Sequence, residues 1–326
     1  MEKILEVNHL SVEFRTAQGI ASAVRDLSFS VNKGEIIGIV GESGSGKSVT
    51  SLAVMGLLDE NTAHIPGGEI LFEGKDLLKL TEKEYCKIRG SEITMVFQEP
   101  AMALNPVIKI EKQLREVYQI HRPSEAKNCH AKLAALLEEL RIPDAERVLQ
   151  KYPFELSGGM KQRIMIAMAM LSKPQLMIAD EPTTALDVTT QAEILDLIKI
   201  MQKETGCAVI LITHDLGVIA EMADRVLVMY RGQLVEQRAI GEFYRGACHL
   251  YSRDLLGARP EEFDGRFQAI PGTIPNAYLP LTGCGYCGRC REAEKSCYDT
   301  PPEFFTFPDG SQVRCHKYSR GGMENE

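Results

Sequence analysis

An eight-residue segment near the N-terminus has the residue types and spacing of a phosphate-binding loop. Residues 41–48 read G-E-S-G-S-G-K-S and directly follow an apolar run at residues 36–40 that predicts a buried strand. Glycine tolerates positive φ and has no Cβ, so consecutive backbone N–H groups can turn inward on an anion where the next helix begins. We expect Lys47 to reach the β- and γ-phosphates of a nucleotide and Ser48 to bind Mg²⁺. Taken alone, the pattern also fits a plain glycine-rich turn.

Two adjacent carboxylates end another apolar run. Residues 176–179 are L-M-I-A and predict a buried strand that leads into Asp180 and Glu181. Because side chains alternate along a strand and change direction at its end, the two acids can serve different tasks. Asp180 is suited to Mg²⁺, directly or through water, and Glu181 to activating an attacking water as general base. Solvated acids at a strand end are the simpler alternative.

A serine and two glycines precede a long apolar helical stretch. Residues 156–163 read L-S-G-G-M-K-Q-R, and residues 164–171 continue as the predicted helix. Such a turn presents a hydroxyl, bare backbone amides and a helix N-terminus to an anion, which predicts a second phosphate contact. By itself, the motif fits Ser157 as a helix N-cap at least as well.

The elements that must position these residues follow from the apolar pattern. Alternating apolar and polar residues predict a small antiparallel β-layer ahead of the phosphate loop, at residues 5–7, 11–14 and 27–31. Helical spacing predicts an insertion from 109 to about 150. The strand at residues 208–212 is separated from the one at 176–179 by a helix, which implies parallel pairing. A hairpin is expected at residues 226–236, and loop-rich sequence follows from 259.

Composition narrows the function classes. The 326 residues are 44% hydrophobic and 25% charged, with a net charge of −8, which argues against extensive contact with nucleic acid or anionic lipid. The longest apolar stretches fall short of the roughly 20 residues needed to cross a bilayer. Residues 1–7 lack the pattern of a secretory signal, so a cytoplasmic location is expected.

The motifs together resemble an ATP-binding-cassette ATPase over residues 3–240. The resemblance rests on residues 41–48, Gln98, residues 156–162, Asp180-Glu181, residues 185–187 and His214, which occur in the order and spacing of that family. Residues 96–106 and 180–189 are similar to the branch that imports oligopeptides, dipeptides or nickel. The resemblance implies an α/β fold: a P-loop (RecA-like) ATPase core with an antiparallel β subdomain, a helical subdomain and a Cys-rich C-terminal extension.

The same resemblance implies domain limits and a dimer. The nucleotide-binding domain is expected at residues 1–245, with its helical subdomain at about 100–170, and the extension at residues 246–326. Two cassettes are expected to pack head to tail, so that the phosphate loop of one faces residues 156–160 of the other. Branch resemblance favours a heterodimer with a second ABC ATPase subunit.

Site residues are likewise implied by the resemblance. Catalysis is assigned to Glu181, His214 and Gln98, and Mg²⁺ binding to Ser48, Gln98 and Asp180. The expected nucleotide-binding residues are Phe14, Gly41, Ser43, Gly44, Ser45, Gly46, Lys47, Ser48, Val49, Gln98, Ser157, Gly158, Gly159, Asp180 and Asp187. Phe14 is expected to stack on adenine, and Asp187 to communicate across the dimer. Met160 stands where many relatives have Gln, a change usual in this branch.

Five of the nine cysteines crowd the C-terminal tail, at Cys284, Cys287, Cys290, Cys297 and Cys315. In a reducing compartment, clustered thiols indicate a metal before a disulfide. The C-x₂-C-x₂-C spacing is typical of iron–sulfur ligation, and Cys₄ zinc and unliganded thiols remain open. The tail pattern of the peptide-importer branch implies that Cys284, Cys290, Cys297 and Cys315 bind a [4Fe–4S] cluster and that Cys287 is extra.

The function implied is that of an ATP-hydrolysing subunit that powers import of di- or oligopeptides, with ATP and Mg²⁺ as cofactors. The implied partners are two integral membrane permease subunits and an extracytoplasmic peptide-binding protein, with no nucleic acid. The chain is expected at the cytoplasmic face of the cell membrane, as a peripheral subunit. Alternatives are a nickel importer ATPase, a regulatory subunit of a non-transport complex, or a cassette protein of DNA maintenance or translation.

Overall fold

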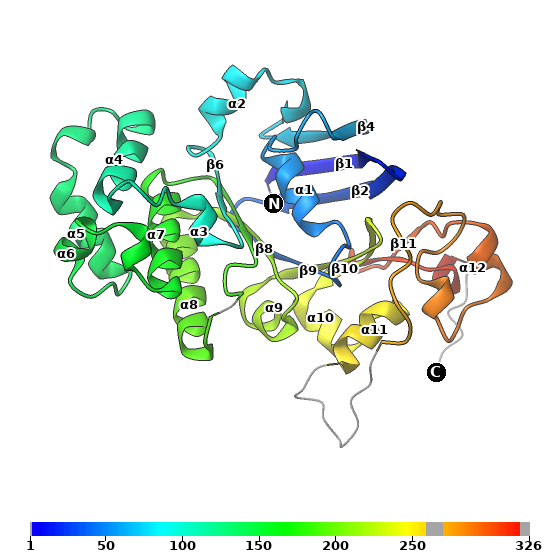
Figure 1. Ribbon diagram of the computed structural model, residues 1–326. Helices are drawn as coiled ribbons and strands as arrows, with labels where there is room; N and C mark the ends of the chain where they lie inside the picture. Colours follow the sequence, from blue (N-terminus) through cyan, green and yellow to red (C-terminus); the bar gives the residue numbers. More distant parts are fainter. Residues whose placement is uncertain (1, 185, 259–269, 320–326) are drawn as a thin grey trace. The chain divides into compact units, whose positions relative to one another are not determined.

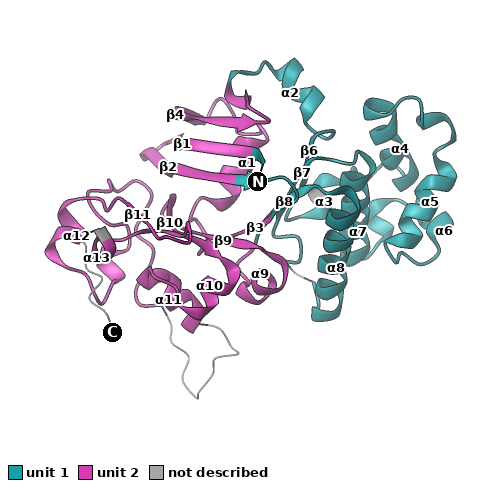
Figure 2. Cartoon of the chain, turned by 180° about the vertical axis from the view of Figure 1, so that it is seen from behind, with its two compact units in different colours: residues 1–4, 31–35, 79–212 teal, residues 5–30, 36–78, 213–326 magenta. Residues whose placement is uncertain are grey.

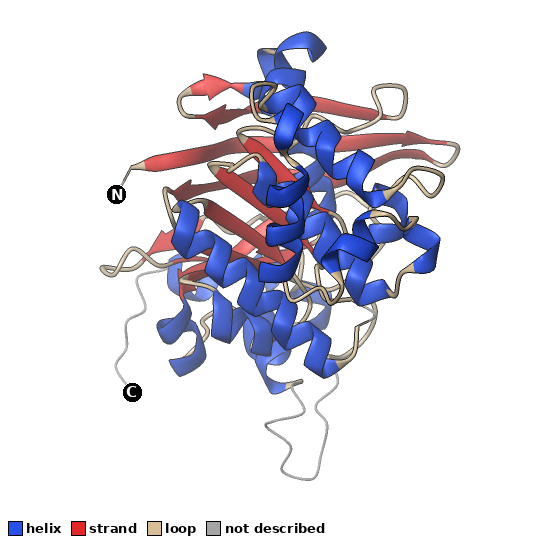
Figure 3. Cartoon of the chain, turned by 90° about the vertical axis from the view of Figure 1, so that its left-hand side faces the viewer, coloured by secondary structure: helices blue, strands red, loops and turns tan. Residues whose placement is uncertain are grey.

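A computed structural model describes residues 2–184, 186–258 and 270–319. The chain divides into two compact units, each made of segments that are far apart in the sequence (Figure 2). The first unit comprises Met1–Ile4, Val31–Glu35 and Lys79–Ile212; the second comprises Leu5–Ser30, Ile36–Leu78 and Thr213–Glu326. Figure 3 shows the helices and strands of the chain, and both units contain elements of each kind, so the expectation of an α/β fold is confirmed.

The first unit contains a parallel sheet with the strand order β6-β7-β8. Its strands are β6 (Ile93–Val96), β7 (Leu176–Asp180) and β8 (Ala208–Ile212). Leu176 lies opposite Ile93 on one side and Ala208 on the other, which confirms the parallel pairing expected across a helix. Every residue of β7 and β8 is buried, as in a parallel sheet that is covered on both faces.

The first unit also contains helices, of which α4, α5, α6 and α7 gather in one group (Figure 1). Their bounds are α2 (Glu82–Ile88), α3 (Pro100–Ala103), α4 (Ile110–His121), α5 (His130–Glu139), α6 (Ala145–Leu149), α7 (Gly158–Leu171) and α8 (Val188–Thr205). Helix α4 buries Ile110, Leu114 and Tyr118, which recur every four residues and form one apolar stripe. The predicted helical insertion is therefore present.

The second unit contains nearly all of an antiparallel sheet with the order β2-β1-β4-β5. Its strands are β1 (Lys3–Thr16), β2 (Gly19–Asn32), β4 (Ala63–Phe72) and β5 (Lys75–Asp76). The sequence predicted two short segments where the structure has one long β1. Its pairing with β4 shifts register between Asn8 and Ser11, and His9 has φ +52°, so an irregularity interrupts the alternation without ending the strand.

A mixed sheet in the second unit has the strand order β11-β12-β10-β9-β3. Its strands are β3 (Ile36–Val40), β9 (Arg225–Tyr230), β10 (Gln233–Ala239), β11 (Phe304–Thr306) and β12 (Gln312–Arg314). Strands β9 and β10 form the predicted hairpin, with left-handed residues Arg231 and Gly232 at its turn. Strands β11 and β12 were expected to be loop. Val313 pairs with Glu236, so the tail extends this sheet beside β10.

The second unit also carries the helix that follows the phosphate loop and several short helices nearer the C-terminus. These are α1 (Lys47–Val54), α9 (Leu216–Met222), α10 (Ile240–Arg245), α11 (Leu250–Gly257), α12 (Lys295–Asp299) and α13 (His316–Ser319). The start of α1 at Lys47 places the phosphate loop between a buried strand and a helix N-terminus, as the motif requires.

Candidate functional site

The phosphate loop connects β3 to α1, and glycines determine its path. Gly41, Gly44 and Gly46 have φ values of +152°, +77° and +102°, in the left-handed region that favours glycine. A Cβ at Gly41 would lie 2.2 Å from the Met229 carbonyl oxygen, and one at Gly46 would lie 2.6 Å from that of Ala23. The loop conformation therefore excludes side chains at two positions on packing grounds alone.

Lys47 opens α1 and is 7% exposed. Its Nζ donates to the Gly41 carbonyl at 2.7 Å and to the Glu42 carbonyl at 3.1 Å. Ser45 is buried, Ser43 and Ser48 are exposed, and Val49 is half-buried. The ammonium thus lies along the loop backbone, where it can complement the charge of a phosphate held by the loop.

The acidic strand end lies in the first unit. Asp180 is the last residue of β7 and is 5% exposed, whereas Glu181 is half-buried and has φ +46°. A left-handed carboxylate residue at a strand end is a strained conformation of the kind found at functional sites. The Glu181 N–H donates to the Ile212 carbonyl at 2.8 Å, which fixes the turn. The structure therefore gives the two acids different environments, as the sequence predicted.

Glu181 is oriented by two donors. Gln98 Nε2 donates to Glu181 Oε2 at 3.0 Å, and Thr184 Oγ1 donates to the same oxygen at 2.8 Å. The structure thus brings together two residues assigned to catalysis from different parts of the sequence. Sequence reasoning missed Thr184, although its place three residues after the acid is a common spacing for a hydroxyl that contacts a turn.

Ser157 is the N-cap of α7, where its Oγ accepts from the Met160 N–H at 3.3 Å. The capping role that the sequence left open is therefore present. A capping hydroxyl can still donate its own proton to an anion. Gly158 is exposed, and a Cβ at Gly159 would lie 2.8 Å from Thr190 Cγ2.

The remaining predicted residues lie on or near the surface of their units. Asp187 is exposed and caps α8, and hydrogen bonds from the Thr190 N–H and hydroxyl, at 3.0 and 2.7 Å, lower the pKa of Asp187. His214 is exposed. Phe14 is half-buried in β1, opposite Ala63 of β4, so part of its ring is accessible.

Each unit thus carries part of the predicted nucleotide site. The second unit holds Phe14, residues 41–49 and His214; the first holds Gln98, Ser157, Gly158, Gly159, Asp180, Glu181 and Asp187. Backbone donors and an ammonium in the second unit, and an oriented carboxylate in the first, are groups that phosphoryl transfer to water requires.

The family of the chain follows from its similarity to known proteins. Residues 24–184 match the family described as ABC transporter. The oligopeptide transport ATP-binding protein AppD of Bacillus subtilis (strain 168) is 43% identical over 99% of both chains. The dipeptide transport ATP-binding protein DppD of the same organism is 45% identical over 97% of this chain and 95% of its own. The chain belongs to the ABC transporter family.

Solved structures of this family have the same fold as the ABC ATPase described here. The dimeric ATP-binding cassette MJ0796 in a post-hydrolysis state, bound to ADP and Pi, has a TM-score of 0.63. It is 25% identical and is matched over 72% of this chain and 98% of its own. CbiO1 from Clostridium perfringens, part of an ABC transporter complex, has a TM-score of 0.63 at 28% identity, over 75% of this chain and 92% of its own.

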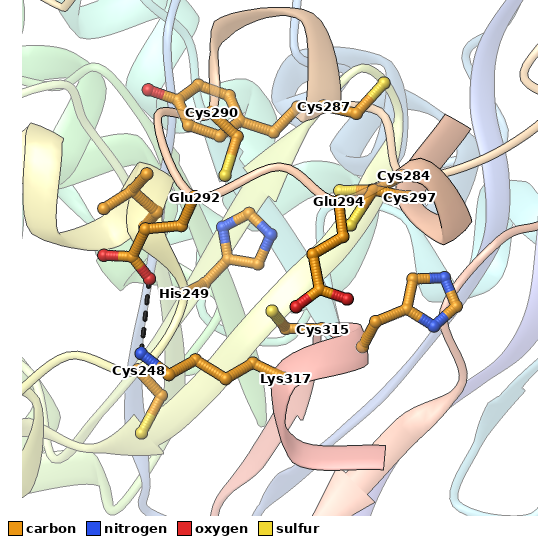
Figure 4. Close-up of a pocket in the computed structure, with 13 residues that line it drawn as sticks. Cys248, His249, Cys284, Cys287, Cys290, Glu292, Glu294, Cys297, Cys315 and Lys317 are labelled. Carbon is orange, nitrogen blue, oxygen red and sulfur yellow. Dashed lines mark hydrogen bonds and ion pairs between the residues drawn. The ribbon is translucent and has the colours of Figure 1, made fainter. Parts of the chain in front are cut away.

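A second feature of the ABC ATPase is a cysteine-lined cavity of about 340 Å³ in the second unit. Six cysteine residues contribute to its lining: Cys248, Cys284, Cys287, Cys290, Cys297 and Cys315. Figure 4 shows Cys290 and Cys315 facing the cavity and Cys284 beside Cys297, whereas the sulfur of Cys287 points away. Cys248, which precedes the predicted tail pattern, was not anticipated because only the fold brings it here.

The chemistry of this cavity favours protonated thiols in the metal-free chain. Burial raises the pKa of Cys284 to about 12 and also raises the pKa values of Cys290 and Cys315. Across the described parts of the chain, no group of three or more His, Cys, Asp or Glu side chains has an arrangement that could hold a metal ion. The cluster expected from the sequence therefore stays a prediction. Likewise, no helix within residues 2–184, 186–258 and 270–319 is long and apolar enough to cross a bilayer.

Proposed function

We propose that this ABC ATPase powers the import of di- or oligopeptides. The observation that carries the proposal is the identity of 43–45% over nearly the full length to AppD and DppD of Bacillus subtilis, which are named for oligopeptide and dipeptide transport. The similarity includes the C-terminal extension, because these matches span 99% and 97% of this chain. Peptide transport thus has support from the whole chain rather than from the cassette alone.

The proposed chemistry is attack of water on the γ-phosphate of ATP. Glu181 acts as general base, and the donors Gln98 and Thr184 orient its carboxylate for accepting a proton from water. Lys47 and the backbone N–H groups of residues 43–48 bind the phosphates, and His214 contacts the γ-phosphate. Ser48, Gln98 and Asp180 would hold Mg²⁺, which would supply positive charge to the phosphate oxygens.

The proposed active assembly contains two cassettes packed head to tail. Ser157, Gly158 and Gly159 of one cassette close on the nucleotide held by Lys47 of the other, and Asp187 communicates between them. The dimeric structure of MJ0796 with ADP and Pi supports a dimer of cassettes in a protein of the same fold. The partner is proposed to be a related chain rather than a second copy, as the branch resemblance implies.

The remaining parts of the proposal concern organisation. Residues 1–245 form the nucleotide-binding domain, and residues 246–326 form the extension. Two membrane permease subunits receive the motion of the cassettes at the cytoplasmic face, and an extracytoplasmic peptide-binding protein delivers the peptide. These partners are inferred from the relatives' names as transport ATP-binding proteins.

The proposed occupant of the cysteine cavity is a [4Fe–4S] cluster held by Cys284, Cys290, Cys297 and Cys315. Thiols that surround a cavity of about 340 Å³ suit a cluster in which each cysteine binds a different iron, whereas zinc draws four thiolates to one point. Binding would release the thiol protons that burial favours in the metal-free chain. Visible absorption of an iron–sulfur chromophore, together with iron and zinc analysis, tests this assignment.

Reconstitution tests the proposed function. The full chain, co-purified with its membrane subunits and placed in vesicles, is supplied with Mg·ATP and with labelled dipeptide, longer peptide or Ni²⁺. ATP-dependent uptake of peptide is expected. Uptake of Ni²⁺ without peptide, or failure of the chain to co-purify with any membrane subunit, would contradict the proposal.

A further inference from the structure

An ion pair between the buried guanidinium of Arg289 and the half-buried carboxylate of Glu42 links the C-terminal extension to the phosphate loop. Arg289 Nη1 donates to Glu42 Oε2 at 2.7 Å, and Arg289 Nη2 donates to Glu42 Oε1 at 3.2 Å. The Arg289 side chain is 5% exposed. Two parallel bonds between a guanidinium and a carboxylate fix direction as well as distance. The extension therefore holds the second residue of the loop in one orientation.

The other contacts of Arg289 leave it little freedom. Its Nε donates to the Pro271 carbonyl at 2.6 Å, and Nη1 also donates to the Tyr230 hydroxyl at 3.2 Å. The guanidinium carbon lies 5.8 Å and 5.7 Å from the ring centroids of Tyr230 and Tyr286. The guanidinium is thus aimed at Glu42 by a fixed frame.

Glu42 is held at its backbone as well. Its N–H donates to the Tyr251 hydroxyl at 2.8 Å, and Tyr251 belongs to α11 and packs 4.6 Å from Tyr230 by ring centroid. Its carbonyl oxygen accepts from Lys47 Nζ at 3.1 Å. The residue that the extension holds is therefore also the residue against which the phosphate-binding ammonium rests.

Stability alone does not explain this pair, because taking the Arg289 guanidinium out of water offsets most of what its attraction to Glu42 contributes. Arg291 offers the extension a separate ion pair, 2.6 Å from Asp254, that touches no loop residue. What is particular to Arg289 is its target, a residue inside the loop whose conformation sets the spacing of the phosphate-binding groups.

We propose that Arg289 is a positioning residue of the ATP site: by holding Glu42 it keeps residues 41–48 in their phosphate-binding conformation and makes ATP affinity depend on the C-terminal extension. This inference rests on the proposed role of Lys47 and the loop. It adds a residue outside the cassette motifs to the nucleotide site.

Nucleotide binding by the purified full chain tests the proposal. Arg289→Met keeps most of the side-chain volume beside Tyr230 but leaves Glu42 without its bidentate partner, so the Kd and KM for Mg·ATP are expected to rise about tenfold or more, with a smaller change in kcat. Arg289→Lys keeps the charge without the fork geometry and is expected to give an intermediate rise. Arg291→Met is the matched control and is expected to leave the Kd unchanged.

Glu42→Gln is a second test that is less disruptive to the fold than Arg289→Met, so it remains informative if Arg289→Met misfolds. It is expected to raise the Kd in the same direction, and adding Arg289→Met to it should raise the Kd little further. If the rise in Kd of the double variant equals the product of the rises in the two single variants, the inference is overturned. Wild-type affinity in Arg289→Met, or an equal rise in Kd in Arg291→Met, would also overturn it.

Lys47→Ala distinguishes failure of the Arg289 inference from failure of the proposed nucleotide site. Loss of ATP binding in Lys47→Ala together with wild-type affinity in Arg289→Met would overturn the inference alone. Unchanged binding in Lys47→Ala would overturn the proposed site and the inference with it.

Discussion

The phosphate loop and the cysteine cavity of the second unit are both built to surround a ligand, but by different means. The loop uses backbone N–H groups and a lysine, and none of these must lose a proton before a phosphate binds. The cavity uses thiols, and burial raises the pKa of Cys284 to about 12, so its ligating form is disfavoured until a cation arrives.

The two sites also differ in what determines their shape. The loop path is fixed by neighbouring backbone, since a Cβ at Gly41 would lie 2.2 Å from the Met229 oxygen. The cavity is shaped by segments that meet only in the fold, with Cys248 joining the tail cysteines. We therefore expect the loop to be formed without ligand and the cavity to be completed by its ligand.

The largest effect is expected from Gly41→Ala. A Cβ there meets the Met229 oxygen at 2.2 Å and requires an L residue at φ +152°, so unfolding free energy should fall by more than about 3 kcal/mol. Gly44→Ala is the control, because its Cβ meets nothing within 4 Å and only the left-handed backbone costs about 1–2 kcal/mol. Chemical denaturation without nucleotide measures both; equal losses would show that packing does not fix the loop.

The ligands of the cysteine cavity are tested by comparing Cys315→Ser with Cys287→Ser. Cys315 faces the cavity and Cys287 points away in Figure 4. Under the proposed [4Fe–4S] assignment, Cys315→Ser is expected to purify without iron or visible absorption, whereas Cys287→Ser and the wild type are expected to purify with both. Retention of iron in Cys315→Ser, with its loss in Cys287→Ser, would reverse the ligand assignment.

His249 beside the cavity predicts a pH dependence of the metal-free protein. Burial lowers the pKa of His249 to about 4 from its ordinary 6.5, so the unfolded chain binds more protons between these values. Stability from this group is fully present above pH 6.5 and is lost as pH falls toward 4, by up to about 3 kcal/mol. His249→Asn keeps an acceptor for the Tyr251 N–H and should flatten that slope in denaturation at several pH values. An unchanged slope would contradict the prediction.

The smallest effect is expected from Ser157→Ala. Loss of the cap on α7 should lower unfolding free energy by about 1 kcal/mol, because the Met160 N–H loses its acceptor. The same variant is expected to lower ATP turnover of the assembled transporter, since Ser157 is proposed to face the partner's nucleotide. Loss of stability with normal turnover would leave Ser157 with a capping role only.

Local patterns were enough to predict much of the fold and the nucleotide site. The loop at residues 41–48, the strand before Asp180 and the insertion that contains α4 are each encoded by neighbouring residues. Segments whose structure depends on distant partners were not predictable in this way. Strands β11 and β12 have three residues each and exist because β10 offers a free edge, which no local periodicity reports.

The contacts of the site residues likewise divide into those that local sequence predicted and those that only the fold reveals. The assignment of Glu181 came from its place after an apolar strand, and that of Gln98 from the family resemblance, whereas the hydrogen bond between them was found only in the structure. The bond between Arg289 and Glu42 had no signal in the sequence, because an arginine between two cysteines gives no indication of its partner. Only the fold reveals which carboxylate it meets.

Turnover by the Glu181→Gln variant tests the central claim most directly. In the assembled transporter, ATP binding should match the wild type, and steady-state hydrolysis should fall at least about 100-fold, because the neutral amide cannot accept a proton from the attacking water. Glu139→Gln, at an exposed position of α5, serves as the matched control and should hydrolyse ATP normally. Hydrolysis at the wild-type rate in Glu181→Gln would contradict the account.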